Sequence, residues 1–193
     1  MRSRRGPAEN LILPQAEALI RATGADIRIG GDRAFYVPGA DYIQVPPPAA
    51  YFEPINWHRT ALHELGHWSG AAHRLNRDLS GGFGSPSYAR EELVAEMCGA
   101  FVCAALAIVP TVRHADYLAS WLEILREDNR AIIRAASAAS KAADYLLAFR
   151  DGDPPPRPSA SEPNATGAIA ALPCPGLRVP AASFRGKGPR GNC

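Results

Sequence analysis

The string His63-Glu64-Leu65-Gly66-His67 constrains this 193-residue chain more than any other feature, and it lies in an amphipathic stretch at residues 55–69. Positions i and i+4 of an α-helix differ by about 40° in azimuth, so both imidazoles leave one face of the helix. Two neutral imidazole nitrogens can then reach one ion at about 2.0–2.1 Å, the distance that zinc requires. Glu64 is placed to act as general base toward a water on that ion. The alternative is two surface histidines beside an ordinary glutamate.

A zinc centre of this kind needs a third protein ligand from another element. No His-x-x-Gly-x-x-His continuation follows His67, so the ligand is sought downstream. Glu92 and Glu96 are also one helical turn apart, in an apolar stretch where buried carboxylates need a cation or hydrogen-bond donors. We predict that Glu92 ligates the metal and that Glu96 orients a histidine, with the reverse assignment as the alternative. A solvated face for both glutamates is the competing interpretation.

Apolar periodicity and turn residues predict an α+β fold: a small antiparallel sheet with four to five helices. Proline cannot donate to a strand ladder, so the Pro46-Pro47-Pro48 run ends the last strand. Ser87 is the expected N-cap of the glutamate-bearing helix. The predicted helices cover residues 15–23, 54–69, about 87–108, 118–125 and 132–146. The predicted strands cover residues 26–29, 34–37 and 42–45.

Side chains outside these motifs are assigned mainly from their hydrophobicity. His58 is expected at the surface, and Cys98 and Cys103, which lack zinc-knuckle spacing, are expected to be buried reduced thiols. The large aromatic residues expected in the core are Trp57, Trp68 and Phe101.

Several polar residues flank the two motif-bearing helices. The run of basic residues after the first motif, His73, Arg74 and Arg77, is expected to form a solvated turn, and the alternative is that it binds an acidic group or an oxyanion. Tyr88, near the start of the second helix, is a further candidate. We therefore keep Tyr88 and His73 as candidate oxyanion or substrate contacts.

Composition divides the chain into a globular part, residues 14–150, and two segments expected to be disordered, 1–13 and 151–193. The second segment holds nine of the 18 prolines and cannot bury enough apolar surface to offset its ordering entropy. Residues 1–150 carry no net charge, which argues against a strongly positive surface that would attract nucleic acid. With no membrane-length apolar run and no signal-like start, the chain is expected to be cytoplasmic.

A resemblance covers about residues 14–149. Residues 60–70, then 74–79 and 83–84, then 88–96, resemble the zincin-like metallopeptidase domain of ArdC-type antirestriction proteins, which also occurs in TraC-type primases of conjugative plasmids. Residues 24–28, 34–36, 41–46 and 115–147 follow the same pattern. The resemblance implies a zincin-like fold, with the HExxH helix packed beside a glutamate-bearing helix. It also implies carriage on mobile elements and protection of incoming DNA from restriction.

The resemblance leaves the activity as a choice between hypotheses. The leading one is a zinc-dependent peptidase with Glu64 as general base and an unknown protein or peptide substrate. The second is a catalytically silent, zinc-stabilised antirestriction or DNA-associated binding module, and the third is a helical adaptor without metal. Relatives usually carry a single-stranded-DNA-binding domain before this one. Only about a dozen residues precede the match here, so we expect weak single-stranded-DNA binding through the chain ends, and no membrane association.

Overall fold

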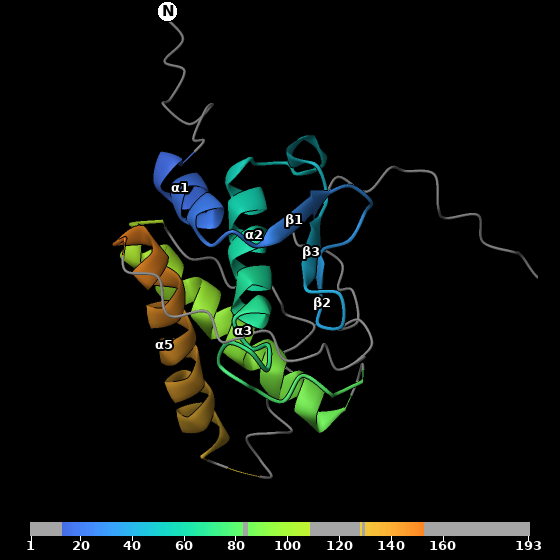
Figure 1. The fold of residues 1–193 in the computed structure, drawn as a ribbon, viewed down its shortest axis with the longest axis vertical. Coiled ribbons are helices and arrows are strands. Elements are labelled where there is room, and N and C mark those ends of the chain that lie inside the picture. Colours follow the sequence, from blue (N-terminus) through green and yellow to red (C-terminus); the bar gives the residue numbers. More distant parts are fainter. Residues whose placement is uncertain (1–12, 83–84, 109–127, 129, 153–193) are drawn as a thin grey trace, which may run out of the picture.

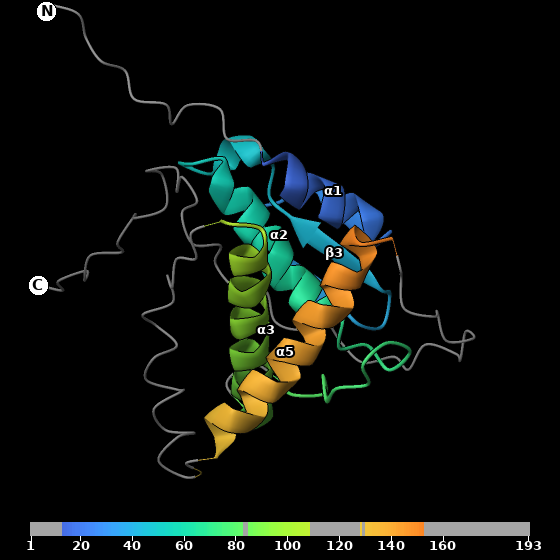
Figure 2. The same ribbon diagram turned by 90° about the vertical axis from the view of Figure 1, so that its left-hand side faces the viewer.

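Helix α2 (Ile55–Trp68) is the centre of the fold. In the computed structural model it lies between a three-stranded sheet on one side and helices α3 (Pro86–Ala105) and α5 (Ala131–Arg150) on the other (Figures 1 and 2). The structure describes residues 13–82, 85–108, 128 and 130–152. Helix α1 (Pro14–Ala22) packs on α2 and α5, and a short 3-10 helix, η1 (Pro48–Ala50), follows the sheet. The α+β prediction is confirmed.

The sheet is mixed, so the prediction of an antiparallel sheet was wrong. Its order is β1 (Asp26–Ile29), β3 (Tyr42–Val45), β2 (Phe35–Val37). β1 pairs in parallel with β3, and β2 pairs antiparallel with it. Ile43 and Val45 of β3 are fully buried, whereas Ile29 of β1 is 60% exposed. β3, the strand with the most buried side chains, takes the central position and pairs on both sides. β1 and β2, which are neighbours in sequence, therefore do not pair with each other.

Helix α5 packs on α3 through small side chains, which allow two helices to approach closely. Ile132, the first residue of the helix predicted at 132–146, is 43% exposed although it is apolar. The buried face of α5 consists of Ala131, Ala135, Ala139, Ala142, Ala143 and Leu146. The predicted helix at 118–125 lies outside the described residues. So do the predicted disordered segments, apart from Leu13, Asp151 and Gly152.

Burial corrects two of the side-chain assignments. His58 is only 3% exposed, because it faces α1, where its Nε2 lies 3.7 Å from Glu17 Oε1. Phe101 is 39% exposed, on the outer face of α3. Trp68 is buried, as expected, whereas Trp57 is only partly buried where it packs against the core, and its indole N–H donates to the Pro46 carbonyl at 3.0 Å.

Cys98 and Cys103 are buried and free, as expected. Burial raises the pKa of Cys98 to about 12 and that of Cys103 to about 11. Among the described helices, none has both the length and the hydropathy needed to cross a bilayer.

Candidate metal centre

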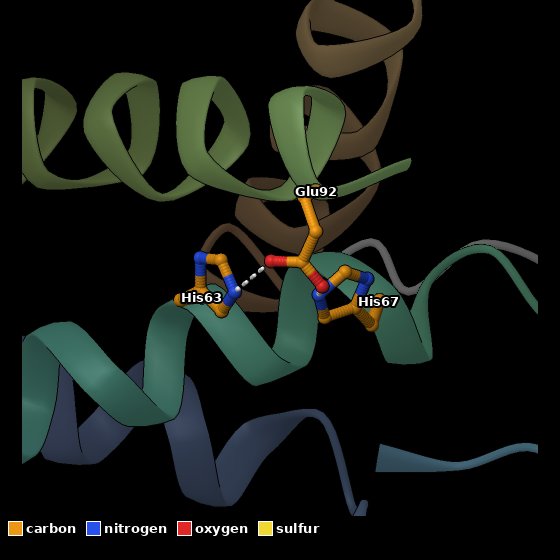
Figure 3. A group of neighbouring side chains, drawn as sticks. All are labelled: His63, His67 and Glu92. Carbon is orange, nitrogen blue, oxygen red and sulfur yellow. Dashed lines mark ion pairs between the residues drawn. The ribbon is translucent and has the colours of Figure 1, made fainter. Parts of the chain in front are cut away.

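Two histidines project from one face of α2 toward α3. His63 and His67 stand one turn apart, with ring centroids 4.9 Å apart and planes at 83° (Figure 3). The side chain of His67 is 2% exposed and that of His63 is 14% exposed. The helix therefore presents both imidazoles to the same buried space, as the i, i+4 spacing requires.

Helix α3 supplies the facing carboxylate. It begins at Pro86, whose fixed φ suits the first helical position. The predicted N-cap, Ser87, was wrong: the cap is Ser85, whose hydroxyl accepts a hydrogen bond from the Tyr88 backbone N–H at 3.2 Å. From this start, Glu92 extends from α3 toward the two imidazoles (Figure 3).

Glu92 bridges the two histidines with one oxygen each. Its Oε2 lies 3.6 Å from His63 Nε2, and its Oε1 lies 3.3 Å from His67 Nε2. Among the described residues, His63, His67 and Glu92 form a group whose potential ligand atoms all lie within 4.8 Å of one another. Bond lengths of about 2.0–2.1 Å and tetrahedral angles put zinc ligands roughly 3.3–3.5 Å apart. Two imidazole nitrogens and one carboxylate are also a known catalytic zinc donor set, so these residues fit such an ion.

A second carboxylate lies beside Nδ1, the other nitrogen of each imidazole ring. His63 Nδ1 is 3.2 Å from Glu96 Oε2, and His67 Nδ1 is 3.2 Å from Glu91 Oε1. A carboxylate beside Nδ1 favours a proton there, so that in the neutral imidazole the lone pair that binds a metal is on Nε2, the nitrogen that faces Glu92. Sequence reasoning missed Glu91 because it sought partners only at i+4 from Glu92. The signal lay in a third acidic residue adjacent to Glu92 in an otherwise apolar stretch.

These carboxylates create a field that favours positive charge. Burial opposes protonation of His67, but Glu92 and Glu91 outweigh it and raise its pKa to about 9. Burial likewise opposes protonation of His63, yet Glu92 and Glu96 raise the pKa of that imidazole well above its usual value. The two imidazoles in turn hold the pKa of Glu92 well below its usual range, against the effect of burial. A divalent ion bound to the neutral imidazoles would supply the positive charge that these carboxylates favour.

The remaining candidate residues occupy different surroundings. Glu64 is 5% exposed, and its charge is near enough to His63 to contribute to the raised pKa of that imidazole. Tyr88 is 4% exposed within the hydrophobic core. His73 belongs to a separate cluster: its Nε2 lies 3.3 Å from Asp41 Oδ2 and 2.5 Å from Arg74 Nη1.

The side chains of Arg74 and Arg77 are mostly buried, so the expectation of a solvated turn was wrong for both. The Arg74 side chain is 5% exposed, stacks 3.9 Å from the centroid of the Trp68 ring, and pairs with Asp41. The Arg77 side chain is 12% exposed and donates to Glu91 and to the Gly66 carbonyl. The last carbonyls of a helix have no intrahelical partner. Arg74 Nε donates to the Trp68 carbonyl at 2.5 Å, so both guanidiniums satisfy carbonyls at the end of α2.

Comparison with known proteins identifies close relatives. The family model described as zincin-like metallopeptidase matches residues 14–138. The uncharacterised protein y4eC of Sinorhizobium fredii (strain NBRC 101917 / NGR234) is 47% identical over 150 residues, which are 74% of this chain and 49% of that protein. DNA primase TraC of Escherichia coli is 46% identical over 137 residues, which are 70% of this chain and 13% of the primase.

Solved structures agree with these sequence matches. The crystal structure of the antirestriction protein ArdC from plasmid R388, in its Mn(II)-bound form, matches with a TM-score of 0.64 and 41% identity over 70% of this chain and 52% of ArdC. The metal-free form matches with a TM-score of 0.63 and 40% identity over 72% of this chain and 51% of ArdC. The chain thus spans about half the length of ArdC and of y4eC. It belongs to the zincin-like metallopeptidase family and contains a zincin-like domain of the ArdC type.

Proposed function

We propose that this domain is a metal-dependent peptidase, in which His63, His67 and Glu92 hold one divalent ion and Glu64 is the general base. The observation that carries the proposal is the shared carboxylate: both Nε2 atoms face Glu92, at 3.6 and 3.3 Å. A pair of surface histidines would be solvated, whereas His67 and Glu92 are 2% and 3% exposed. Burial of so many ionisable groups is costly unless a cation or hydrogen bonds compensate it.

We propose zinc as the resident ion. Nitrogen-rich sites bind zinc more tightly than manganese in the general order of divalent-metal affinities. The ArdC structure with Mn(II) supports a divalent ion in this fold and makes manganese the alternative. Metal analysis of the purified protein by inductively coupled plasma mass spectrometry distinguishes the two.

The chemistry divides between the ion and the side chains. When bound, the ion acts as a Lewis acid toward a water molecule and a carbonyl oxygen. Glu64 accepts the proton of the attacking water and passes it to the leaving amine nitrogen. Glu91 and Glu96 keep the proton of each imidazole on Nδ1, so that both Nε2 atoms stay available as ligands. His73 and Tyr88 remain proposals for groups that contact the substrate or the developing oxyanion.

The biological setting proposed for this activity is antirestriction by a mobile element. ArdC is an antirestriction protein of plasmid R388, and the TraC primase also carries a matching segment. A peptide or protein substrate fits the chemistry of the site.

The test is cleavage of unfolded casein by the zinc-loaded chain, with Glu64→Gln and chelated protein alongside. Glu64→Gln should keep the ion and the fold but lose hydrolysis, because an amide cannot accept the proton of the water. Glu53→Gln, a change of an exposed glutamate before α2, is the matched control and should keep full activity. Unchanged cleavage by Glu64→Gln would contradict the mechanism. A wild-type protein that binds zinc tightly without cleaving would favour the structural role of the ion in a silent binding module.

A further inference from the structure

The Arg77 guanidinium holds both oxygens of the carboxylate that contacts His67. Arg77 Nη2 donates to Glu91 Oε1 at 2.7 Å, and Nε donates to Glu91 Oε2 at 3.0 Å. Glu91 Oε1 is also the atom that lies 3.2 Å from His67 Nδ1. The three side chains are 12%, 7% and 2% exposed, so solvent screens this chain of contacts little.

The same guanidinium is anchored to α2 itself. Arg77 Nη1 donates to Ser69 Oγ at 3.0 Å, and Nη2 donates to the Gly66 carbonyl at 2.6 Å. The Ser69 hydroxyl donates to the same carbonyl at 2.6 Å. Arg77 therefore ties Glu91 of α3 to the turn of α2 that carries His67.

Gly70 provides the space for this arrangement. A Cβ at Gly70 would lie 2.7 Å from Arg77 Nη2 and 2.8 Å from its Cζ, closer than real Cβ contacts. Any side chain at this position would therefore displace the guanidinium.

We propose that Arg77 is a positioning residue for the metal centre: by holding both oxygens of Glu91 it fixes the carboxylate that orients His67, and so sets the affinity for a divalent ion. The proposal rests on the proposed function, because it requires His67 to be a ligand. It assigns a role to a residue outside the ligand set and on a different segment from both motif-bearing helices.

If Arg77 acted through its charge alone, it would have the opposite effect on metal affinity. A guanidinium near a cation repels it, so neutralising Arg77 would strengthen metal binding if Coulomb repulsion were its main effect. Positioning predicts that the same change weakens binding, because Glu91 would no longer be held against His67. The direction of the change in affinity thus separates the two roles.

The experiment measures Zn²⁺ affinity of the full chain by competition with a chromophoric chelator. Arg77→Gln and Arg77→Lys should each weaken binding by roughly ten-fold or more, within the 10–100-fold range typical of groups that orient metal ligands. Gly70→Ala should act in the same direction while leaving the arginine and its charge in place. Arg74→Gln is the matched control: it alters another mostly buried arginine of the same turn, one that pairs with Asp41 and not with Glu91, and it should leave affinity unchanged.

A double-mutant cycle and a spectrum complete the test. If Arg77 acts through Glu91, Arg77→Gln should have no further effect on the affinity of Glu91→Gln. The absorption spectrum of the Co²⁺-loaded chain should change in Arg77→Gln and not in Arg74→Gln, since it reports the geometry of the ligands. Should Arg77→Gln fail to fold, Gly70→Ala and Arg77→Lys decide the question.

Unchanged or tighter Zn²⁺ binding in the folded Arg77 and Gly70 variants would overturn the proposal, as would an equal loss in Arg74→Gln. If the proposed function itself is wrong because His67 is not a ligand, His67→Ala will keep its zinc. The two failures therefore give different results.

Discussion

Gly66 of α2 packs directly against Ala95 of α3: a Cβ at Gly66 would lie 3.2 Å from the Cα of Ala95 and 3.3 Å from its carbonyl oxygen. Gly66 immediately precedes His67, and Ala95 lies between Glu92 and Glu96. The absence of a side chain at position 66 thus lets the two helices approach closely where Glu92 must reach both imidazoles.

Gly66→Ala should therefore disturb both stability and metal binding. The added methyl must push α3 away by a few tenths of an ångström, and such overpacking typically costs about 1–3 kcal/mol. We expect a lower urea midpoint in the presence of chelator and weaker Zn²⁺ binding. Gly99→Ala is the control, because its Cβ would meet His63 at an ordinary 3.6 Å and would gain about 0.8–1 kcal/mol of helix propensity. Equal stability of Gly66→Ala and wild type would contradict this reading of the contact.

Removal of any proposed ligand should remove the metal. His63→Ala, His67→Ala and Glu92→Ala should each be purified without stoichiometric zinc, because two ligands of three do not hold the ion in competition with water. Glu96→Ala should keep zinc but bind it roughly 10–100-fold more weakly. Mass spectrometric metal analysis and chelator competition measure both effects. Loss of zinc in Glu96→Ala with retention in Glu92→Ala would mean that the two glutamates exchange roles.

Chelation should lower the melting temperature of the wild-type chain. An ion that binds only the folded state at a free concentration of 100 times its Kd stabilises it by about 2.7 kcal/mol. The melting temperature with excess zinc should therefore exceed that with chelator by several degrees in a calorimetric scan. His67→Ala should show no such difference, and a zinc-dependent shift of wild-type size in that variant would place the stabilising ion elsewhere.

Asp41 should make stability fall in acid. Burial opposes its ionisation, but hydrogen bonds from Arg74 and Tyr36 outweigh that effect and lower its pKa. A carboxyl with a depressed folded-state pKa stabilises the fold above its unfolded value of about 3.9, and this contribution is lost as pH falls through the lower folded value. Asp41→Asn, which tolerates the left-handed φ of 49° at this position, should therefore be less stable than wild type at pH 7.

The stability difference between wild type and Asp41→Asn should shrink as pH approaches 3, measured by urea unfolding with chelator present so that metal release does not contribute. Asp26→Asn removes an exposed carboxylate that pairs with Arg28 at 2.7 Å, and serves as the control with a small effect throughout. A pH-independent deficit in Asp41→Asn would show that the pair contributes by packing rather than by charge.

Single-stranded DNA should bind weakly, and only through the chain ends. Residues 14–150 hold 13 lysines and arginines against 15 aspartates and glutamates, whereas the first seven residues hold three arginines. Since DNA affinity rests largely on basic side chains that neutralise phosphates, a chain trimmed to residues 14–150 should show no binding by fluorescence anisotropy at physiological salt. Tight binding by the trimmed chain would reveal a nucleic-acid surface on the domain.

Local spacing determined much of the fold and the centre of the site. The shared face of His63 and His67 follows from helix geometry within five residues, so it could be predicted without knowing what packs against it. Strands β1 and β3 begin and end where alternation predicts them, and the burial of Cys98 and Cys103 follows from their apolar surroundings. These features depend only on residues a few positions apart.

Tertiary structure decided what one element presents to another. The parallel pairing of β1 with β3, the contact of Glu91 with His67 and the burial of His58 each join segments whose relative placement no local pattern encodes. Arg77 illustrates the reason: in sequence it is a basic residue in a turn, and it becomes a mostly buried link between two helices only because α3 brings Glu91 against the end of α2. Helix and strand periods fix which side chains share a face, but the packing of separate elements fixes which faces meet.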